Sequence, residues 1–585
     1  MKNLKIYFPI VITALASQFS FGQEDENIGS EVVNVVKPYT PTISDAFKVK
    51  ESPVIDDEDN TQKEEIKYNI FSFPVASTFT PAKGQAAAVD KEKKERIFSN
   101  YATLGVGNYG TVNGELYVTH NFGRDSYLGA MLRHLSSQGG IKDAKLDDNY
   151  ATTGLDVTYG SRNRDLNWNV DLGVKRQMNN WYGLPYDNIV FDAPTIESIE
   201  EKQIYNTIAL GGKVGLKDSF FSELTMQFKR FSDDFGSGEN RFWIKPNFDF
   251  EVMDSKVNAD FVVDYVGGSF DRMYAVDSEL KYSNVIFGTK PNFLYQQDDL
   301  SVLIGAGVFY TTGKFNGETD SKIFVYPNVK ASYKIVEDVL IGYAGAEGGL
   351  NQNSYADFVD QNPFISPTLY IAPTDNKYDI YVGLKGKLAS SVSFNVKGSY
   401  NNDDNKALFV SNPYQHNSVT NNTEGYAYGN SFDVVYDNVK TMSIFGEIKA
   451  DFSKSISLAL NGTYNNYSTD LQAEAWNLPQ LKIGANLDFD ITDKWHAGTN
   501  IFFVGERKDI VTIQIMQFPL SAFEQKTITL DSYFDLNAHV GYNFSERLSF
   551  FLRGNNLANQ QYNRWANFPV QGVQVLGGAN YKFDF

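Results

Sequence analysis

The residues that could do chemistry are few and lie far apart in the sequence. Among 585 residues there are five histidines, and no two of them have the spacing of metal ligands. The absence of cysteine excludes disulfides, thiolate metal sites, a cysteine nucleophile and a lipoprotein anchor. The sequence also lacks a P-loop, a nucleophile elbow and a dinucleotide fingerprint. We therefore expect no enzyme activity, no catalytic residue, no cofactor and no metal centre.

Two acidic pairs are the best cation ligands that the sequence offers. Asp233-Asp234 and Asp403-Asp404 fall in predicted outer loops, where carboxylate oxygens could bind Ca²⁺. Such pairs are more often solvated surface residues, so they predict no metal site. His539 occupies a polar position in an alternating segment, which is typical of a solvated residue facing a lumen.

Composition excludes nucleic acid as a partner. The chain has 71 acidic and 52 basic residues, whereas nucleic-acid binding depends on neutralising phosphates. The 44 Phe, 35 Tyr and 46 Gly residues favour long antiparallel sheets. A mean hydropathy of −0.34 excludes a bundle of membrane helices but permits a membrane barrel, in which apolar and polar residues alternate.

Residues 1–22 have the pattern of a secretory signal peptide. Lys2 and Lys5 form a basic start, residues 6–16 are apolar, and small residues at 20 and 22 predict cleavage after Gly22. No later apolar run is long enough for a transmembrane helix. The mature chain is therefore expected to leave the cytoplasm.

Residues 23–98 differ from everything that follows. They contain charge runs at 56–59 and 91–96, several prolines and little alternation, which predicts an extended or disordered periplasmic segment. One short strand pattern without a hairpin partner stands near its start. This candidate partner-binding strand consists of Glu31, Val32, Val33, Asn34, Val35 and Val36. It could add to the sheet edge of an envelope protein, or pack on the mouth or lumen wall of a barrel.

From residue 99 to residue 585, segments of alternating apolar and polar residues follow one another. In residues 534–544 (FDLNAHVGYNF), for example, every even position is apolar. This period of two predicts strands with one apolar and one polar face. Many such segments in succession indicate an all-β fold, a transmembrane antiparallel β-barrel with its apolar face towards lipid. An exported sandwich or solenoid is the alternative, but the segments are too long for a sandwich and show no fixed repeat.

The turns predict the number of strands. Ten short polar turns alternate with eleven longer or more variable loops, which gives about 22 strands. In outer-membrane barrels the short turns face the periplasm and the long loops face outside, so both termini are expected in the periplasm. The predicted organisation is a signal peptide (1–22), a periplasmic segment (23–98) and an outer-membrane barrel (99–585).

The last strand is expected to close the barrel. A barrel in lipid must pair its final strand with its first, because an open edge cannot be satisfied there. Tyr581, Phe583 and Phe585 form the aromatic face of this strand, and we predict that they serve in barrel closure and as an assembly signal. The partners implied are outer-membrane lipid, lipopolysaccharide and the barrel-assembly machinery.

The C-terminal sequence carries a family resemblance. Residues 554–562 (GNNLANQQY), 568–572 (FPVQG) and 577–583 (GGANYKF) resemble the last two strands of TonB-dependent receptors. The chain departs from that family at Val573, where the family has arginine, and it continues two residues beyond the usual aromatic end. The resemblance is specific over these residues and looser back to about residue 476. The signal-peptide end and the Asn- and Tyr-rich strands are similar to outer-membrane proteins of Bacteroidota.

The resemblance implies a barrel filled by an N-terminal plug domain, but residues 23–98 are too few and lack the Gly-rich alternation of a plug. The chain therefore looks like a plugless relative. Residues 31–36 stand where the family has its TonB-contact box, so contact with TonB is a third possible role for them.

Two functions follow as hypotheses. The first is a TonB-dependent receptor type of barrel that takes up a nutrient across the outer membrane of a Gram-negative bacterium. The alternative is a non-transporting barrel subunit of an outer-membrane complex, in envelope or outer-membrane-protein assembly, that binds partners through its N-terminal segment and loops. A barrel of this size leaves a wide lumen, which the N-terminal segment, the long loops or another protein must close.

Overall fold

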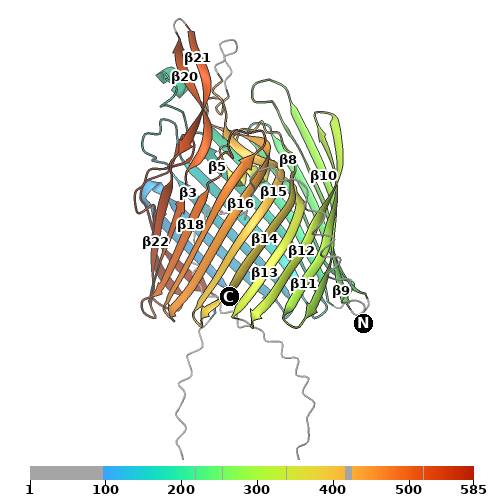
Figure 1. Cartoon of the computed structure of the whole chain (residues 1–585). Coiled ribbons are helices and arrows are strands. Elements are labelled where there is room, and N and C mark those ends of the chain that lie inside the picture. Colours follow the sequence, from blue (N-terminus) through green and yellow to red (C-terminus); the bar gives the residue numbers. More distant parts are fainter. Residues whose placement is uncertain (1–96, 218, 253–254, 338, 416–423, 518–519) are drawn as a thin grey trace, which may run out of the picture. The chain divides into compact units, whose positions relative to one another are not determined.

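The computed structural model describes residues 97–585, except for residues 218, 253–254, 338, 416–423 and 518–519. Within these residues, 22 strands form one closed antiparallel sheet, as the sequence predicts (Figure 1). No helix in this part of the chain is long and apolar enough to cross a membrane. The predicted signal peptide and residues 31–36 lie outside the described residues, and the predicted boundaries at 22 and 98 stay predictions.

The strands of the barrel follow the order of the chain. They are β1 (Asn100–Gly107), β2 (Val112–Phe122), β3 (Ser126–Ser137), β4 (Tyr150–Arg162), β5 (Leu166–Asn180), β6 (Lys202–Leu216), β7 (Phe221–Asp233), β8 (Gly238–Val252), β9 (Ser255–Phe270), β10 (Leu280–Gln297), β11 (Leu300–Phe315), β12 (Glu318–Val336), β13 (Leu340–Asn351), β14 (Thr374–Ala389), β15 (Val392–Ser411), β16 (Phe432–Ser453), β17 (Ile456–Thr469), β18 (Leu481–Asp490), β19 (Trp495–Val504), β22 (Tyr533–Asn543), β23 (Leu548–Asn555) and β26 (Gln574–Phe583).

The remaining elements belong to loops. They are the hairpin β20 (Arg507–Gln517) and β21 (Leu520–Leu530), the small pair β24 (Asn563–Trp565) and β25 (Phe568–Pro569), the helices α2 (Ala193–Glu197) and α3 (Tyr355–Gln361), and a 3₁₀ turn at Asn108–Gly110.

The barrel closes between its first and last strands. β1 pairs with β2 on one side and with β26 on the other, with Asn100 opposite Phe583 and Gly107 opposite Leu576. The seam leaves no room at Gly578, where a Cβ atom would lie 2.3 Å from the carbonyl oxygen of Leu104. The backbone groups of β1 and β26 are therefore paired, and no sheet edge is left open.

The strands that flank each of the ten predicted short turns are neighbours in the sheet. The strand ends joined by these turns lie at the barrel end where β1 begins and β26 ends, because each pair of strands returns the chain to that end. The long loops lie at the opposite end, called the loop end below. Residues 407–410 and 432–436 alternate in the sequence and could form hairpins beyond the wall, and in the structure β15 extends to Ser411 and pairs there with the start of β16 at Phe432. The predicted loop at 508–529 instead contains the hairpin β20–β21.

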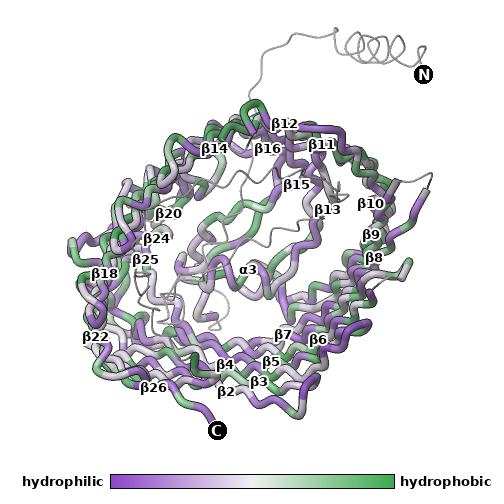
Figure 2. The backbone as a smooth tube through the Cα atoms, turned by 90° about the horizontal axis from the view of Figure 1, so that it is seen from below, coloured by the Kyte–Doolittle hydropathy of each residue, from purple (hydrophilic) through white to green (hydrophobic). Residues whose placement is uncertain are grey.

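The wall alternates between an apolar outer face and a polar inner face. On β5, Val170, Leu172 and Val174 are 44–46% exposed on the outer face. The residue that follows them, Lys175, points inwards to an aspartate inside the ring. Exposed apolar side chains of this kind occur on most strands of the wall. Hydrophobic and hydrophilic residues follow one another along the strands (Figure 2). This is the pattern of a barrel surrounded by lipid.

The largest apolar core lies near the loop end and not within the wall. It joins aromatic residues of the β6–β10 wall to the start of β16 and to the loops after β13 and β23, and its members include Tyr355, Phe358, Ile365, Leu369, Phe432 and Phe568. The loops of this end are therefore folded together in and over the lumen.

Candidate functional site: a strap across the barrel lumen

The loop between β13 and β14 crosses the inside of the barrel. Residues 352–373, called the strap below, leave the wall after Asn351 and return to it at Thr374. The strap carries helix α3, which lies inside the ring of strands in the view along the barrel axis (Figure 2). The strap therefore occupies part of the lumen.

The start of α3 is fixed to the wall by a buried glutamate. Glu239 on β8 is 1% exposed and accepts hydrogen bonds from the backbone N–H groups of Tyr355 and Ala356, at 2.7 and 3.2 Å. The hydroxyl of Tyr282 on β10 donates to the same carboxylate at 2.7 Å. Ser354 caps the helix by accepting from the N–H of Asp357. The glutamate thus satisfies two of the free N–H groups at a helix start, where negative charge is favourable.

The polar face of α3 meets three cations of the lumen wall. Asp357 accepts hydrogen bonds from Lys229 on β7 at 3.3 Å and from Arg241 on β8 at 2.6 Å. One helical turn further on, Asp360 pairs with Lys175 on β5 at 2.8 Å. Because both carboxylates lie on one face of the helix, α3 is held to three strands at once.

The charges around Asp357 control its protonation. Burial alone would raise the pKa of this carboxyl group, but Lys229 and Arg241 outweigh the burial and lower its pKa. Asp357 is therefore ionised at neutral pH, and both of its cationic partners stay engaged. Arg241 is also bound by both carboxylate oxygens of Asp264 on β9, at 2.7 and 3.0 Å, which fixes the guanidinium plane.

The apolar face of α3 and the rest of the strap pack into the core at the loop end. Phe358 and Val359 are buried, and Phe364 stacks on Phe568 with the ring centroids 3.9 Å apart. The strap is also tied to neighbouring loops and wall, since Trp181 donates from its indole nitrogen to the carbonyl of Phe364 at 3.1 Å. The strap therefore bridges opposite sides of the lumen through one continuous core.

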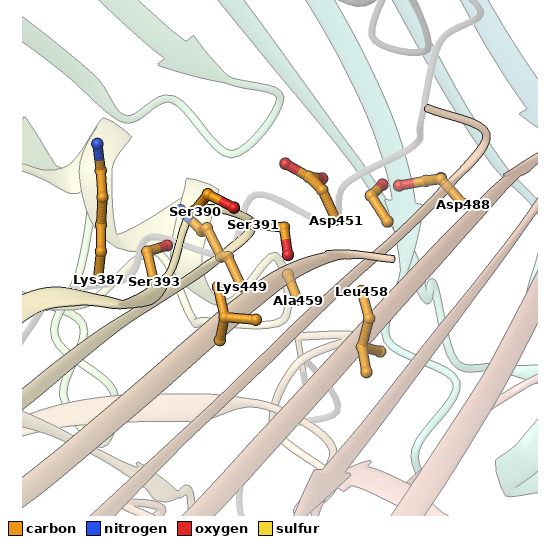
Figure 3. A pocket seen from close by; sticks show the side chains of 11 residues that line it. Lys387, Ser390, Ser391, Ser393, Lys449, Asp451, Leu458, Ala459 and Asp488 are labelled. Carbon is orange, nitrogen blue, oxygen red and sulfur yellow. The ribbon is translucent and has the colours of Figure 1, made fainter. Parts of the chain in front are cut away.

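A hollow lies at the other end of the barrel, beside the short turns. It measures about 390 Å³ and is lined by Lys387, Lys449, Asp451, Asp488 and the serines 390, 391, 393 and 457 (Figure 3). The lining mixes both charges without a convergent set of ligands. The wall residues here offer a hydrated polar surface and not a shaped site.

The described residues do not gather into a metal centre. No group of three or more His, Asp or Glu side chains among these residues could hold a metal ion. The acidic pairs are divided between other tasks: Asp233 accepts from the hydroxyl of Tyr355, and Asp403 pairs with Lys406. The lumen wall instead uses its charges to hold the strap.

The C-terminal aromatic residues lie along the closing seam. Tyr581 stands opposite Ala102 on β1 and Leu548 on β23, and its ring stacks on that of Phe583. Phe585 follows the end of β26, is 82% exposed and contacts Phe583 edge-on. This geometry describes the seam, and the role of the three residues as an assembly signal stays a prediction.

Sequence reasoning did not find the residues that fix the strap. Lys175, Lys229, Arg241 and Glu239 appear in the sequence as ordinary inward positions of alternating strands. One signal was available: Ser354-Tyr355-Ala356-Asp357 has the spacing of a helix cap followed by an acidic residue, in a loop otherwise assigned no structure.

The sequence matches no known protein family, and no curated protein is similar to it in sequence. Solved structures do share the fold. The pyoverdine outer-membrane receptor FpvA from Pseudomonas aeruginosa PAO1 is 12% identical with a TM-score of 0.60, covering 84% of this chain and 79% of that protein. The ferric-catecholate import receptor Fiu from E. coli K12 is 11% identical, with a TM-score of 0.59 and coverages of 84% and 82%.

The siderophore receptor PirA from Acinetobacter baumannii is likewise 14% identical, with a TM-score of 0.59 and coverages of 84% and 81%. At this level of identity the likeness shows the fold. The chain has the barrel architecture of outer-membrane receptors.

Proposed function

We propose that this protein is an outer-membrane barrel of the TonB-dependent receptor type, from a Gram-negative bacterium of the Bacteroidota kind, that takes up a nutrient. The observation that carries the proposal is the strap inside a 22-strand barrel with an apolar outer face. The strap is attached to the wall at both ends and held in part by ion pairs. Uptake requires it to move aside while the barrel stays folded. The strap takes the position that a plug domain has in the family that the C-terminus resembles.

The proposal places both termini in the periplasm and the loop end outside the cell. Residues 31–36 are then on the side where TonB or an envelope partner could reach them. Tyr581, Phe583 and Phe585 would present the seam to the barrel-assembly machinery. The fold neighbours named above are receptors and an importer by their own descriptions, which supports uptake only in general terms.

Uptake can be tested by deleting the gene and limiting one nutrient at a time in the medium. We expect slower growth on at least one limiting nutrient, restored by the wild-type gene but not by a variant lacking residues 31–36. Unchanged growth under every limitation would contradict the proposal. Restoration by both genes would limit the contradiction to the role of residues 31–36.

A second function is favoured by the size of the core at the loop end. Twenty buried residues from strands, strap and loops pack together there, and such a core is costly to open. A barrel subunit that never opens would need no other closure. In that case gentle-detergent purification from the native membrane should recover stoichiometric envelope proteins, whereas a lone barrel supports uptake.

A further inference from the structure

We propose that Lys175, Lys229 and Arg241 form an anion site on the lumen wall, which the strap occupies with its own carboxylates and which a small solute with two or more acid groups takes when the strap leaves. The inference rests on the proposed uptake function and names its substrate class. The strap would then mimic the ligand that displaces it.

The first argument is the register of the wall. Lys229 and Arg241 stand directly opposite each other on β7 and β8, and both point into the lumen. Like charges in this position destabilise a sheet. Asp357 lies between the two cations and contacts both, which relieves the repulsion. When the strap leaves, Asp264 still pairs with Arg241, but Lys229 loses the carboxylate of Asp357, which favours another anion in the same place.

The second argument is the local count of charge. Asp264 binds Arg241 with both oxygens and so neutralises one of the three cations. Asp357 and Asp360 neutralise the other two. The remaining nearby carboxylate, Glu239, is engaged by the strap N–H groups and by Tyr282. Without the strap, three cations face the two wall carboxylates Asp264 and Glu239, which leaves one positive charge in excess.

The third argument is spacing. Side chains three residues apart on a helix have Cβ atoms about 5–6 Å apart, so the strap presents two carboxylates at that separation. A di- or tricarboxylate of the size of citrate presents its acid groups at a similar distance. The guanidinium of Arg241 adds planar recognition of a carboxylate. These features favour a compact polycarboxylate over a neutral solute.

Citrate is a suitable probe, and the strap variant Asp357→Asn/Asp360→Asn removes the two carboxylates that compete for the site while keeping the cations. Isothermal titration calorimetry of the folded variant in detergent should detect citrate binding. The wild type should bind citrate at least tenfold more weakly than this variant. Adding Lys229→Gln to the strap variant should weaken its citrate binding at least tenfold. The matched control is Lys213→Gln, which removes a lumen cation that pairs with Glu223 away from the strap contacts. This control should change the citrate affinity of the strap variant less than twofold. Absence of citrate binding, or equal loss in the control, overturns the proposal.

A second measurement uses the full strap, because the double variant could fold poorly. The chain has no native cysteine, so Ala356→Cys provides a single reporter on α3 that is buried while the strap is docked. Millimolar citrate should raise its maleimide labelling rate at least threefold over sodium chloride of equal ionic strength, and an unchanged rate overturns the proposal. If citrate binds but the deletion strain grows normally, the uptake function fails and the anion site stands. The reverse result leaves uptake standing and refutes the site.

Discussion

Replacing Glu239 by glutamine should release the strap. Glu239 accepts two backbone N–H groups of α3 and the Tyr282 hydroxyl, and its side chain is buried. Glutamine keeps the shape but removes the charge, and its NH₂ group faces a donor of the strap or of Tyr282. A hydrogen bond to a charged group contributes about 1.5–3 kcal/mol. Because about 1.4 kcal/mol corresponds to a factor of ten, we expect the open fraction of the strap to rise about 10- to 100-fold.

The Ala356→Cys reporter measures this fraction directly. When the strap opens and closes faster than the reagent reacts, the labelling rate follows the population of the open state. Glu239→Gln should therefore raise the rate by the same factor of about 10 to 100. The control is Glu223→Gln, which removes an exposed lumen carboxylate paired with Lys213. A rise of less than threefold, or an equal rise in the control, would refute the docking role of Glu239.

Three further predictions concern the seam, the hairpin and the core. Gly578→Val should prevent closure and abolish the heat-dependent mobility shift of a folded barrel on gels, whereas Gly577→Ala, whose Cβ meets its nearest atom at 3.7 Å, should fold normally. Burial raises the pKa of Asp509 on β20 to about 6, so the protonated carboxyl group favours the packed hairpin. The hairpin should therefore lose about 3 kcal/mol of stability as the pH rises from about 4 to 6. Hydrogen exchange of the hairpin amides, corrected for intrinsic rates, measures this pH dependence, and Asp509→Asn should remove it. A pH dependence that persists in the variant would contradict its assignment to Asp509. Phe568→Ala should cost the loop-end core about 3–5 kcal/mol and speed Ala356→Cys labelling, while equal labelling rates would contradict the role of the Phe364 stack.

Much of the barrel could be predicted because its strands and turns depend on residues close together in the sequence. A period of two places apolar residues on the outer face, and short polar turns mark where each hairpin ends. Residues 534–544, for example, alternate in the sequence and form β22 in the structure. The prediction that long loops could close the lumen also agrees with the position of residues 352–373, although the sequence left three candidates for that task.

The strap contacts could not be predicted because they join distant parts of the chain. Asp357 meets Arg241 across 116 positions, and Lys175 meets Asp360 across 185. Alternation shows that a lysine points inwards, but not which loop descends to meet it.

The central claim is that the strap closes the barrel, and electrical conductance in planar lipid bilayers tests it most directly. The wild-type protein is compared with a variant in which residues 352–373 are replaced by a short Gly/Ser linker between β13 and β14. We predict brief, small currents for the wild type and large, steady current steps for the variant. Equal currents from the two proteins would show that something other than the strap controls the lumen.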